Sequence, residues 1–162
     1  MAENTILSSE ELQNLKEKYE QLTTTFQKDN KEFLLFKSEP ITYLRNSGIV
    51  VMKYIDNKYS PVIVKKLHLT IKNILRSTHV FNRCAWCKIF VLLIIYSTIC
   101  KSEMIFDVGI EALSSIMESV KEIFNTDNEF IKRITYYLKR INSRLSHFVL
   151  ARLICEHLGY CP

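Results

Sequence analysis

The apolar stretch Ile89-Phe90-Val91-Leu92-Leu93-Ile94-Ile95-Tyr96 is the longest in this 162-residue chain. It continues to Cys100 and is flanked by Lys88 and Lys101. The stretch is shorter than the roughly 20 residues that a membrane-spanning helix needs. It is apolar nearly all round, as is typical of a helix buried inside a globule. We therefore expect it to form the central helix of one folded domain.

Helical periodicity extends on both sides of this stretch. Apolar residues recur at steps of three and four between Leu12 and Phe26, with Ser8 or Ser9 as a candidate N-cap. Further helices are expected over about 41–59 and 107–124, and after the capping-box sequence of residues 126–129. Residues 62–75 are expected to form one or two short helices. The chain has only three Gly and three Pro, which is too few for the turns of an all-β fold.

The expected fold is therefore all-α, a seven- to eight-helix globular bundle around the central apolar helix. We expect a single domain over residues 1–162. Residues 1–39 would form an N-terminal helix and linker, and residues 40–125 the central core. Residues 126–162 would form basic amphipathic C-terminal helices.

Positive charge is concentrated in the last part of the chain. Residues 132–162 contain six basic residues and one acidic residue, whereas the two signs balance before them. A solvated helix face is one interpretation of this pattern, and peripheral contact with an anionic membrane is another. Tyr136 and Tyr137 lie among these charges, but no nucleic-acid-binding module is recognised, so no nucleic acid is expected as a partner.

The sequence contains no pattern typical of catalysis. No glycine-rich phosphate loop occurs, and the four His are scattered without a nucleophile or a relay partner. We expect no enzyme activity, no catalytic residues and no cofactor.

The five cysteines allow three interpretations. Cys84 and Cys87 form a C-x-x-C motif, which is found in thiol redox sites and in zinc sites. A zinc site would need further ligands, and the only close cluster is Cys155, His157 and Cys161. Cysteine is also among the most buried residue types. Because residues 1–30 contain no signal-peptide pattern, we expect reduced, buried thiols and no metal.

Two short segments lie in the order and at the distance found in a known family. Leu44 to Gly48 reads L-x-x-x-G, and about forty residues later Trp86-Cys87-Lys88 opens the apolar helix. These segments resemble the Bcl-2 family of apoptosis regulators, whose motifs are L-x-x-x-G-D and N-W-G-R. The chain departs from these motifs at four positions: Ile49 for Asp, Ala85 for Asn, Cys87 for Gly and Lys88 for Arg. Residues 125–130 also lack the G-G-W signature that follows in the family. Divergent members of this kind look like the viral ones.

The resemblance implies a surface groove that receives an amphipathic helix from pro-apoptotic Bcl-2 family proteins. Lys88 would face an Asp of the partner, and Trp86 would form part of the groove floor. Because Ile49 replaces the Asp that a killing motif needs, the role implied is inhibition of apoptosis. The location implied is the host cytoplasm, in association with the mitochondrial outer membrane. The partner-binding residues implied are Leu44, Gly48, Val51, Trp86, Lys88 and Ile89.

Purely structural roles are also possible for the same residues. Trp86 could be a core aromatic residue, and Lys88 could be a helix-start cation with a buried stem. A second functional hypothesis keeps the bundle without a groove. The chain would then inhibit immune signalling through its outer helical surfaces or through a homodimer interface.

Overall fold

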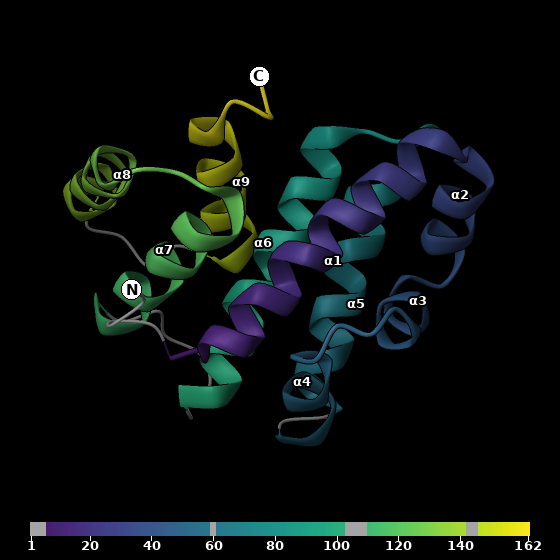
Figure 1. Cartoon of the computed structure of the whole chain (residues 1–162), viewed down its shortest axis with the longest axis horizontal. Coiled ribbons are helices and arrows are strands. Elements are labelled where there is room, and N and C mark those ends of the chain that lie inside the picture. The colour runs from purple at the N-terminus through teal and green to yellow at the C-terminus, as the bar shows by residue number, and fades with distance from the viewer. Residues whose placement is uncertain (1–5, 59–60, 103–109, 142–145) are drawn as a thin grey trace.

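Helices form all of the regular structure in the computed structural model, which describes residues 6–58, 61–102, 110–141 and 146–162. The all-α class predicted from the sequence is confirmed, although the described residues form nine helices rather than seven or eight. Figure 1 shows their arrangement. They are α1 (Ser9–Lys28), α2 (Asn30–Ser38), α3 (Pro40–Asn46), α4 (Met52–Lys58), α5 (Val62–Leu75), α6 (Arg83–Ser102), α7 (Ile110–Phe124), α8 (Asn128–Ile141) and α9 (His147–Leu158).

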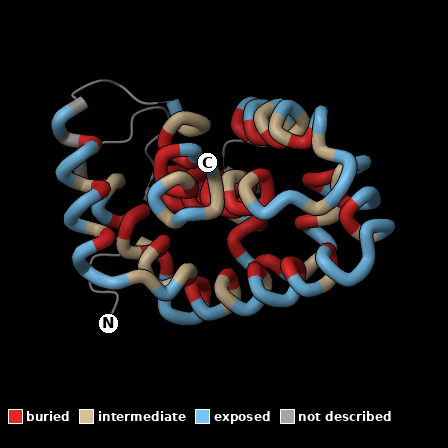
Figure 2. The backbone as a smooth tube through the Cα atoms, turned by 90° about the horizontal axis from the view of Figure 1, so that it is seen from above, coloured by how far each residue is buried: buried red, intermediate tan, exposed pale blue. Residues whose placement is uncertain are grey.

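The predicted central helix is α6. Every residue from Ala85 to Cys100 is buried except Lys88, which is half-buried. The helix packs against α4, α5, α7 and α9, and α1 crosses it at the front in Figure 1. All nine helices contribute side chains to one contiguous apolar cluster. The buried positions of the helices face this shared interior in Figure 2.

Burial, rather than length, distinguishes α6 from a membrane span. The apolar stretch alone is short, but the helix that contains it is 20 residues long. Residues 83–101 are therefore long and apolar enough to cross a bilayer, yet 83% of the most apolar window lies buried inside the protein. The core helix of a globule has these same properties.

The segment predicted as one helix over residues 41–59 is instead two short helices. Gly48 lies between α3 and α4 with a φ of +81°, in the left-handed region that only glycine adopts readily. Asn14 of α1 holds this turn: its amide nitrogen donates to the Gly48 carbonyl over 3.1 Å, and its side-chain oxygen accepts from the Val50 amide over 3.0 Å. The prediction of a continuous helix is therefore wrong.

The start of α1 confirms the predicted cap. The Ser8 hydroxyl accepts from the Glu11 amide, and the Glu11 carboxylate accepts from the Ser8 amide, which makes a complete capping box. The next predicted linker is wrong in part, because α2 occupies most of it. At α8 the observed cap is Asp127, whose carboxylate accepts from the Phe130 amide over 2.9 Å. The sequence also favours Ser60 as the N-cap before Pro61, at the start of the helical pattern over residues 62–75, but Ser60 lies outside the described residues.

Candidate functional site

Four of the six predicted partner-binding residues lie in the core. Leu44, Val51, Trp86 and Ile89 each have 0% of their surface exposed. A partner helix cannot contact these side chains while the bundle is closed. The structure therefore brings the two motif segments into one interior, but it does not place their apolar residues on a groove surface.

Trp86 is the centre of an aromatic cluster between α6 and the first two helices. Its indole ring lies within 6 Å, centroid to centroid, of four other rings: Tyr19, Phe26, Phe36 and Phe90. Its Nε1 donates a 2.8 Å hydrogen bond to the hydroxyl of Thr23, so the polar edge of the indole is satisfied inside the core. These contacts are those of a core aromatic residue.

Gly48 is exposed, but it faces α1. A Cβ at this position would lie 3.2 Å from Lys18 Nζ. The turn that contains Gly48 is therefore held against the N-terminal helix, and its backbone carbonyl is already paired with Asn14.

Lys88 faces α9. Its Nζ lies 5.6 Å from the centroid of the Phe148 ring, in a cation–π arrangement. Burial lowers the pKa of Lys88, nearby Arg152 lowers it further, and Glu156 opposes both effects. Arg152 and Glu156 are themselves paired, with 3.5 Å between Nε and Oε1. The Lys88 ammonium is therefore half-buried under the last helix and does not face an open groove.

An open depression of about 330 Å³ lies between α3 and α5. Its apolar lining comes from Ile41 on α3 and from Pro61 and Val64 at the start of α5. Ile41 is buried and Val64 half-buried, so these side chains form the floor rather than the rim. The volume is at the lower end of the range for ligand pockets and fits one or two apolar side chains.

Charged groups and one histidine line the same depression. Arg45 follows Ile41 by one turn of α3, and Lys65 and His68 follow Val64 on one face of α5. Glu39 contributes one acidic group at the end of α2. Lys65 is exposed to solvent. The arrangement can therefore receive an apolar side chain and pair a neighbouring carboxylate.

Sequence reasoning missed this depression, although part of its pattern is visible. Pro61, Val64 and His68 are spaced as one helix face. That α3 lies beside α5 follows from tertiary packing, and no local pattern reports it.

The prediction of five reduced thiols is wrong for four of them. Cys84 is bonded to Cys161, and Cys87 is bonded to Cys155, with Cα atoms 4.8 and 6.1 Å apart. Cys100 is buried in α6 and takes part in neither disulfide. Cys84 and Cys87 lie three residues apart on the first turn of α6, so both face the same side. Cys87 pairs with a residue of α9 and Cys84 with a residue that follows α9, rather than with each other. Among the described residues, no group of three or more potential ligands could hold a metal ion.

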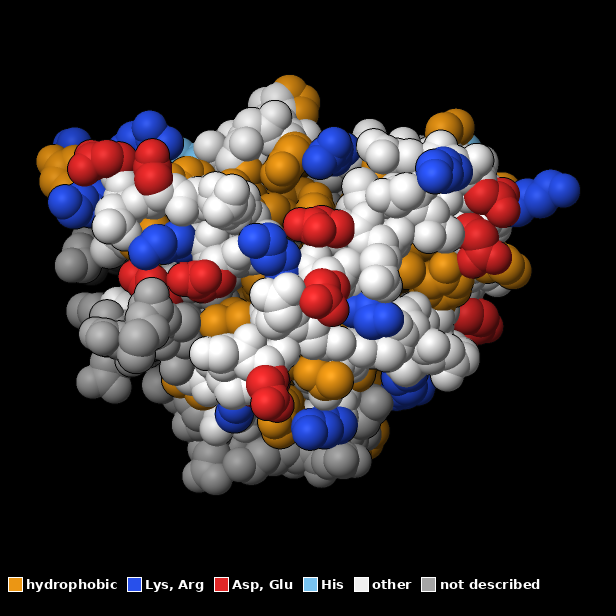
Figure 3. Space-filling model, in the orientation of Figure 1, with side chains coloured by type: hydrophobic (Ala, Val, Ile, Leu, Met, Phe, Trp, Pro, Cys, Tyr) orange, Lys and Arg blue, Asp and Glu red, His pale blue; other side chains and the backbone are white. Residues whose placement is uncertain are grey.

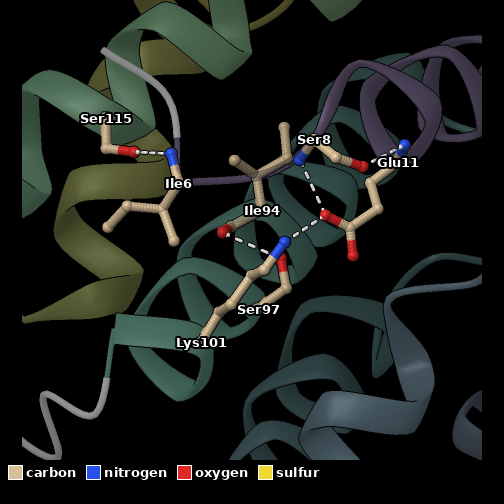
Figure 4. A network of polar contacts seen from close by, with 7 residues as sticks. All are labelled: Ile6, Ser8, Glu11, Ile94, Ser97, Lys101 and Ser115. Carbon is tan, nitrogen blue, oxygen red and sulfur yellow. Dashed lines mark hydrogen bonds and ion pairs between the residues drawn. The ribbon is translucent and has the colours of Figure 1, made fainter.

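A polar network joins the start of α1 to the end of α6 and, through Ile6, to α7. Figure 4 shows Lys101, at the end of α6, forming an ion pair with Glu11 of the α1 capping box. The Ile6 amide donates to the Ser115 hydroxyl of α7 over 2.8 Å in the same view. Although burial raises the pKa of Glu11, hydrogen bonds from Lys101, Ser8 and Tyr54 outweigh it and lower the pKa to about 2. The network therefore holds a charged carboxylate in place and anchors α1 on α6 and α7.

No protein-family model, no curated protein and no solved structure matches the chain.

Proposed function

We propose that the chain is a Bcl-2-like inhibitor of apoptosis that binds amphipathic pro-death helices in the depression between α3 and α5. The observation that carries the proposal is the depression itself, with an apolar floor and a charged lining, beside the helix that contains most of the L-x-x-x-G segment. The order of the helices supports it, because the short helices precede a buried central helix that begins near Trp86.

Recognition would combine desolvation with one charge pair. An apolar anchor of the incoming helix would cover Ile41 and Val64, which form the floor of the depression. A carboxylate one turn away on that helix would approach Lys65 and Arg45. Because Lys65 is an exposed point charge, this pair would set the register of the helix more than its affinity.

The cation that pairs with the incoming helix is then Lys65, and not Lys88 as the family resemblance implied. Lys88 is packed over Phe148 and has Arg152 nearby, so an approaching carboxylate would first have to displace α9. Lys65 lines the depression directly and is exposed. The two positions therefore make opposite predictions for charge reversal.

Calorimetric titration with a panel of pro-death helical peptides tests the proposal. We expect low-micromolar binding or better, which Lys65→Glu weakens by about threefold to tenfold, because charge reversal replaces an exposed attraction with a repulsion. Lys28→Glu, at the exposed end of α1, makes the same charge change away from the depression and should bind like the parent chain.

Two results would count against the proposal in different ways. Absence of binding at tens of micromolar across the panel removes helix capture altogether. A loss with Lys88→Glu and none with Lys65→Glu keeps helix capture but places it beside α9.

The buried state of Leu44, Val51, Trp86 and Ile89 favours a second candidate, an immune-signalling inhibitor that acts through its outer surfaces or as a homodimer. The outer face of α1 is polar, since its exposed residues include Gln13, Glu17, Glu20 and Gln21. A dimer formed through this face would therefore bury little apolar area. Light scattering at micromolar concentration, read together with the peptide titration, separates the two candidates. A stable dimer that binds none of the peptides would favour the immune-signalling inhibitor.

A further inference from the structure

The outer face of α8 combines positive charge with exposed aromatic rings. Lys132, Arg133 and Arg140 are exposed, and Tyr136 and Tyr137 between them are 64% and 43% exposed. In Figure 3, basic side chains lie on both sides of an exposed apolar side chain at the upper left, where Figure 1 places α8, with acidic side chains on the inner side.

The opposite face of α8 is not available to a partner. Phe130, Ile134 and Leu138 are buried, and α8 packs on α7. The sequence suggested that a C-terminal amphipathic helix could lie in the headgroup layer with its apolar stripe in the lipid. In the folded protein that stripe belongs to the core, so only the basic and aromatic face is presented.

The ion pair on the outer face of α8 does not neutralise its positive charge. Lys132 has one weak surface partner, since its Nζ is 3.8 Å from Glu129 Oε1 and both side chains are at least three-quarters exposed. The Arg140 guanidinium lies 5.6 Å from the centroid of the Tyr136 ring, which places a cation beside the most exposed aromatic ring of the helix. The sequence before residue 132 has balanced charge, so attraction to an anion would orient this end of the molecule first.

From this we propose that the outer face of α8 docks on an anionic phospholipid surface. Tyrosine flanked by Lys and Arg is the composition found where proteins meet the headgroup layer, because the ring is amphipathic and the cations pair with phosphates. The inference goes beyond the proposed function and uses none of the residues of the α3–α5 depression.

Vesicle flotation tests the docking surface. The probes are vesicles of phosphatidylcholine alone and of two parts phosphatidylcholine to one part phosphatidylserine. We expect the chain to float with the phosphatidylserine vesicles only, and to be released by high salt. The double variant Arg133→Glu with Arg140→Glu should lower the partition coefficient about tenfold or more, since each cation near the surface adds to the attraction.

The matched control is Lys28→Glu with Lys31→Glu, which changes the net charge equally at exposed positions of α1 and α2. The milder pair Arg133→Gln with Arg140→Gln and the single change Tyr136→Ala should each give a smaller loss, and they keep the test valid if the double reversal fails to fold. An equal loss in the control would show attraction by net charge alone and overturn the proposal. So would absence of binding to phosphatidylserine vesicles, or binding to duplex DNA that such vesicles fail to compete.

Discussion

Trp86 links the sequence motif to the packing of the core at the scale of a single residue. Its ring contacts aromatic side chains from α1, α2 and α6, and its only polar atom donates to Thr23. The Thr23 hydroxyl in turn donates to the Tyr19 carbonyl over 2.6 Å. The indole N–H therefore depends on the Thr23 hydroxyl alone, because Trp86 is fully buried and water cannot take the place of that acceptor.

Thr23→Val tests this contact, because it keeps the shape of the side chain and removes the acceptor. We expect the free energy of unfolding to fall by about 1–3 kcal/mol, since the indole N–H is left buried and unpaired. Urea unfolding followed by the fluorescence of Trp86, the only Trp, measures the change. Thr24→Val is the control: its hydroxyl also bonds one turn back but is exposed, so an equal cost there would contradict the assignment.

The Glu11 carboxylate makes stability depend on acid. Its pKa is about 2 in the folded protein against an ordinary value of 4.5. Because the folded value is the lower one, the stabilisation is fully present above about pH 4.5 and is lost as the pH falls towards 2.

Glu11→Gln should therefore flatten the pH dependence between pH 5 and pH 2, while lowering stability at pH 7. Urea midpoints measured across that range provide the test. Glu20→Gln, on the exposed face of the same helix, should keep the slope of the parent chain. An unchanged slope in Glu11→Gln would show that the ion pair with Lys101 does not hold the carboxylate charged.

At the scale of elements, the turn between α3 and α4 is a feature that the periodicity of the sequence could not predict. The apolar spacing over residues 41–59 was compatible with one helix, and Gly48 was its only irregular position. The break depends on a left-handed φ at Gly48 and on Asn14, which reaches it from 34 residues away. A contact of that range leaves no periodic trace in the sequence.

Gly48→Ala distinguishes the two possibilities by the sign of its effect. In a continuous helix, alanine would stabilise the protein by about 1 kcal/mol. In the observed turn it should destabilise by about 1–2 kcal/mol, because the left-handed backbone disfavours a Cβ. Gly159→Ala is the matched control, with a φ of +86° and no atom within 4 Å of the added carbon, and should cost a similar amount. Stabilisation by Gly48→Ala, measured by urea unfolding, would restore the continuous helix.

Two disulfides fix α9 and the residues after it to the first turn of α6. They close separations of 77 and 68 residues. We expect Cys84→Ser with Cys161→Ser to lower the free energy of unfolding by about 2–5 kcal/mol. A reducing cytoplasm would open both disulfides and cost more than this one pair of substitutions, so stability in reducing buffer is the value that bears on a cytoplasmic role.

Peptide mapping without reductant tests the pairing itself. Trypsin should release the segment with Cys84 and Cys87 still joined to the segment with Cys155 and Cys161. Cleavage after Trp86 and after Leu158 then separates the two disulfides. A bond between Cys84 and Cys87 would release the two segments unlinked, and would contradict the two disulfides between α6 and the C-terminal segment.

At the scale of the whole molecule, the sequence was sufficient for the fold class and for its centre. An apolar helix that is hydrophobic on every side has to be buried, and α6 is buried. The pairing of the cysteines and the depression beside Ile41 could not be predicted, because each joins segments distant in the chain. The apolar pattern placed Trp86 and Lys88 at the start of α6, but helical spacing alone does not say which neighbour each side chain faces.

The most direct test of the proposed function is an NMR titration of the isotope-labelled chain with a pro-death helical peptide. If the helix docks between α3 and α5, the amide signals of Thr42, Arg45, Val64 and His68 should shift with the peptide, and those of α8 should not. Shifts confined to Lys88 and α9, or no shifts at saturating peptide, would contradict it.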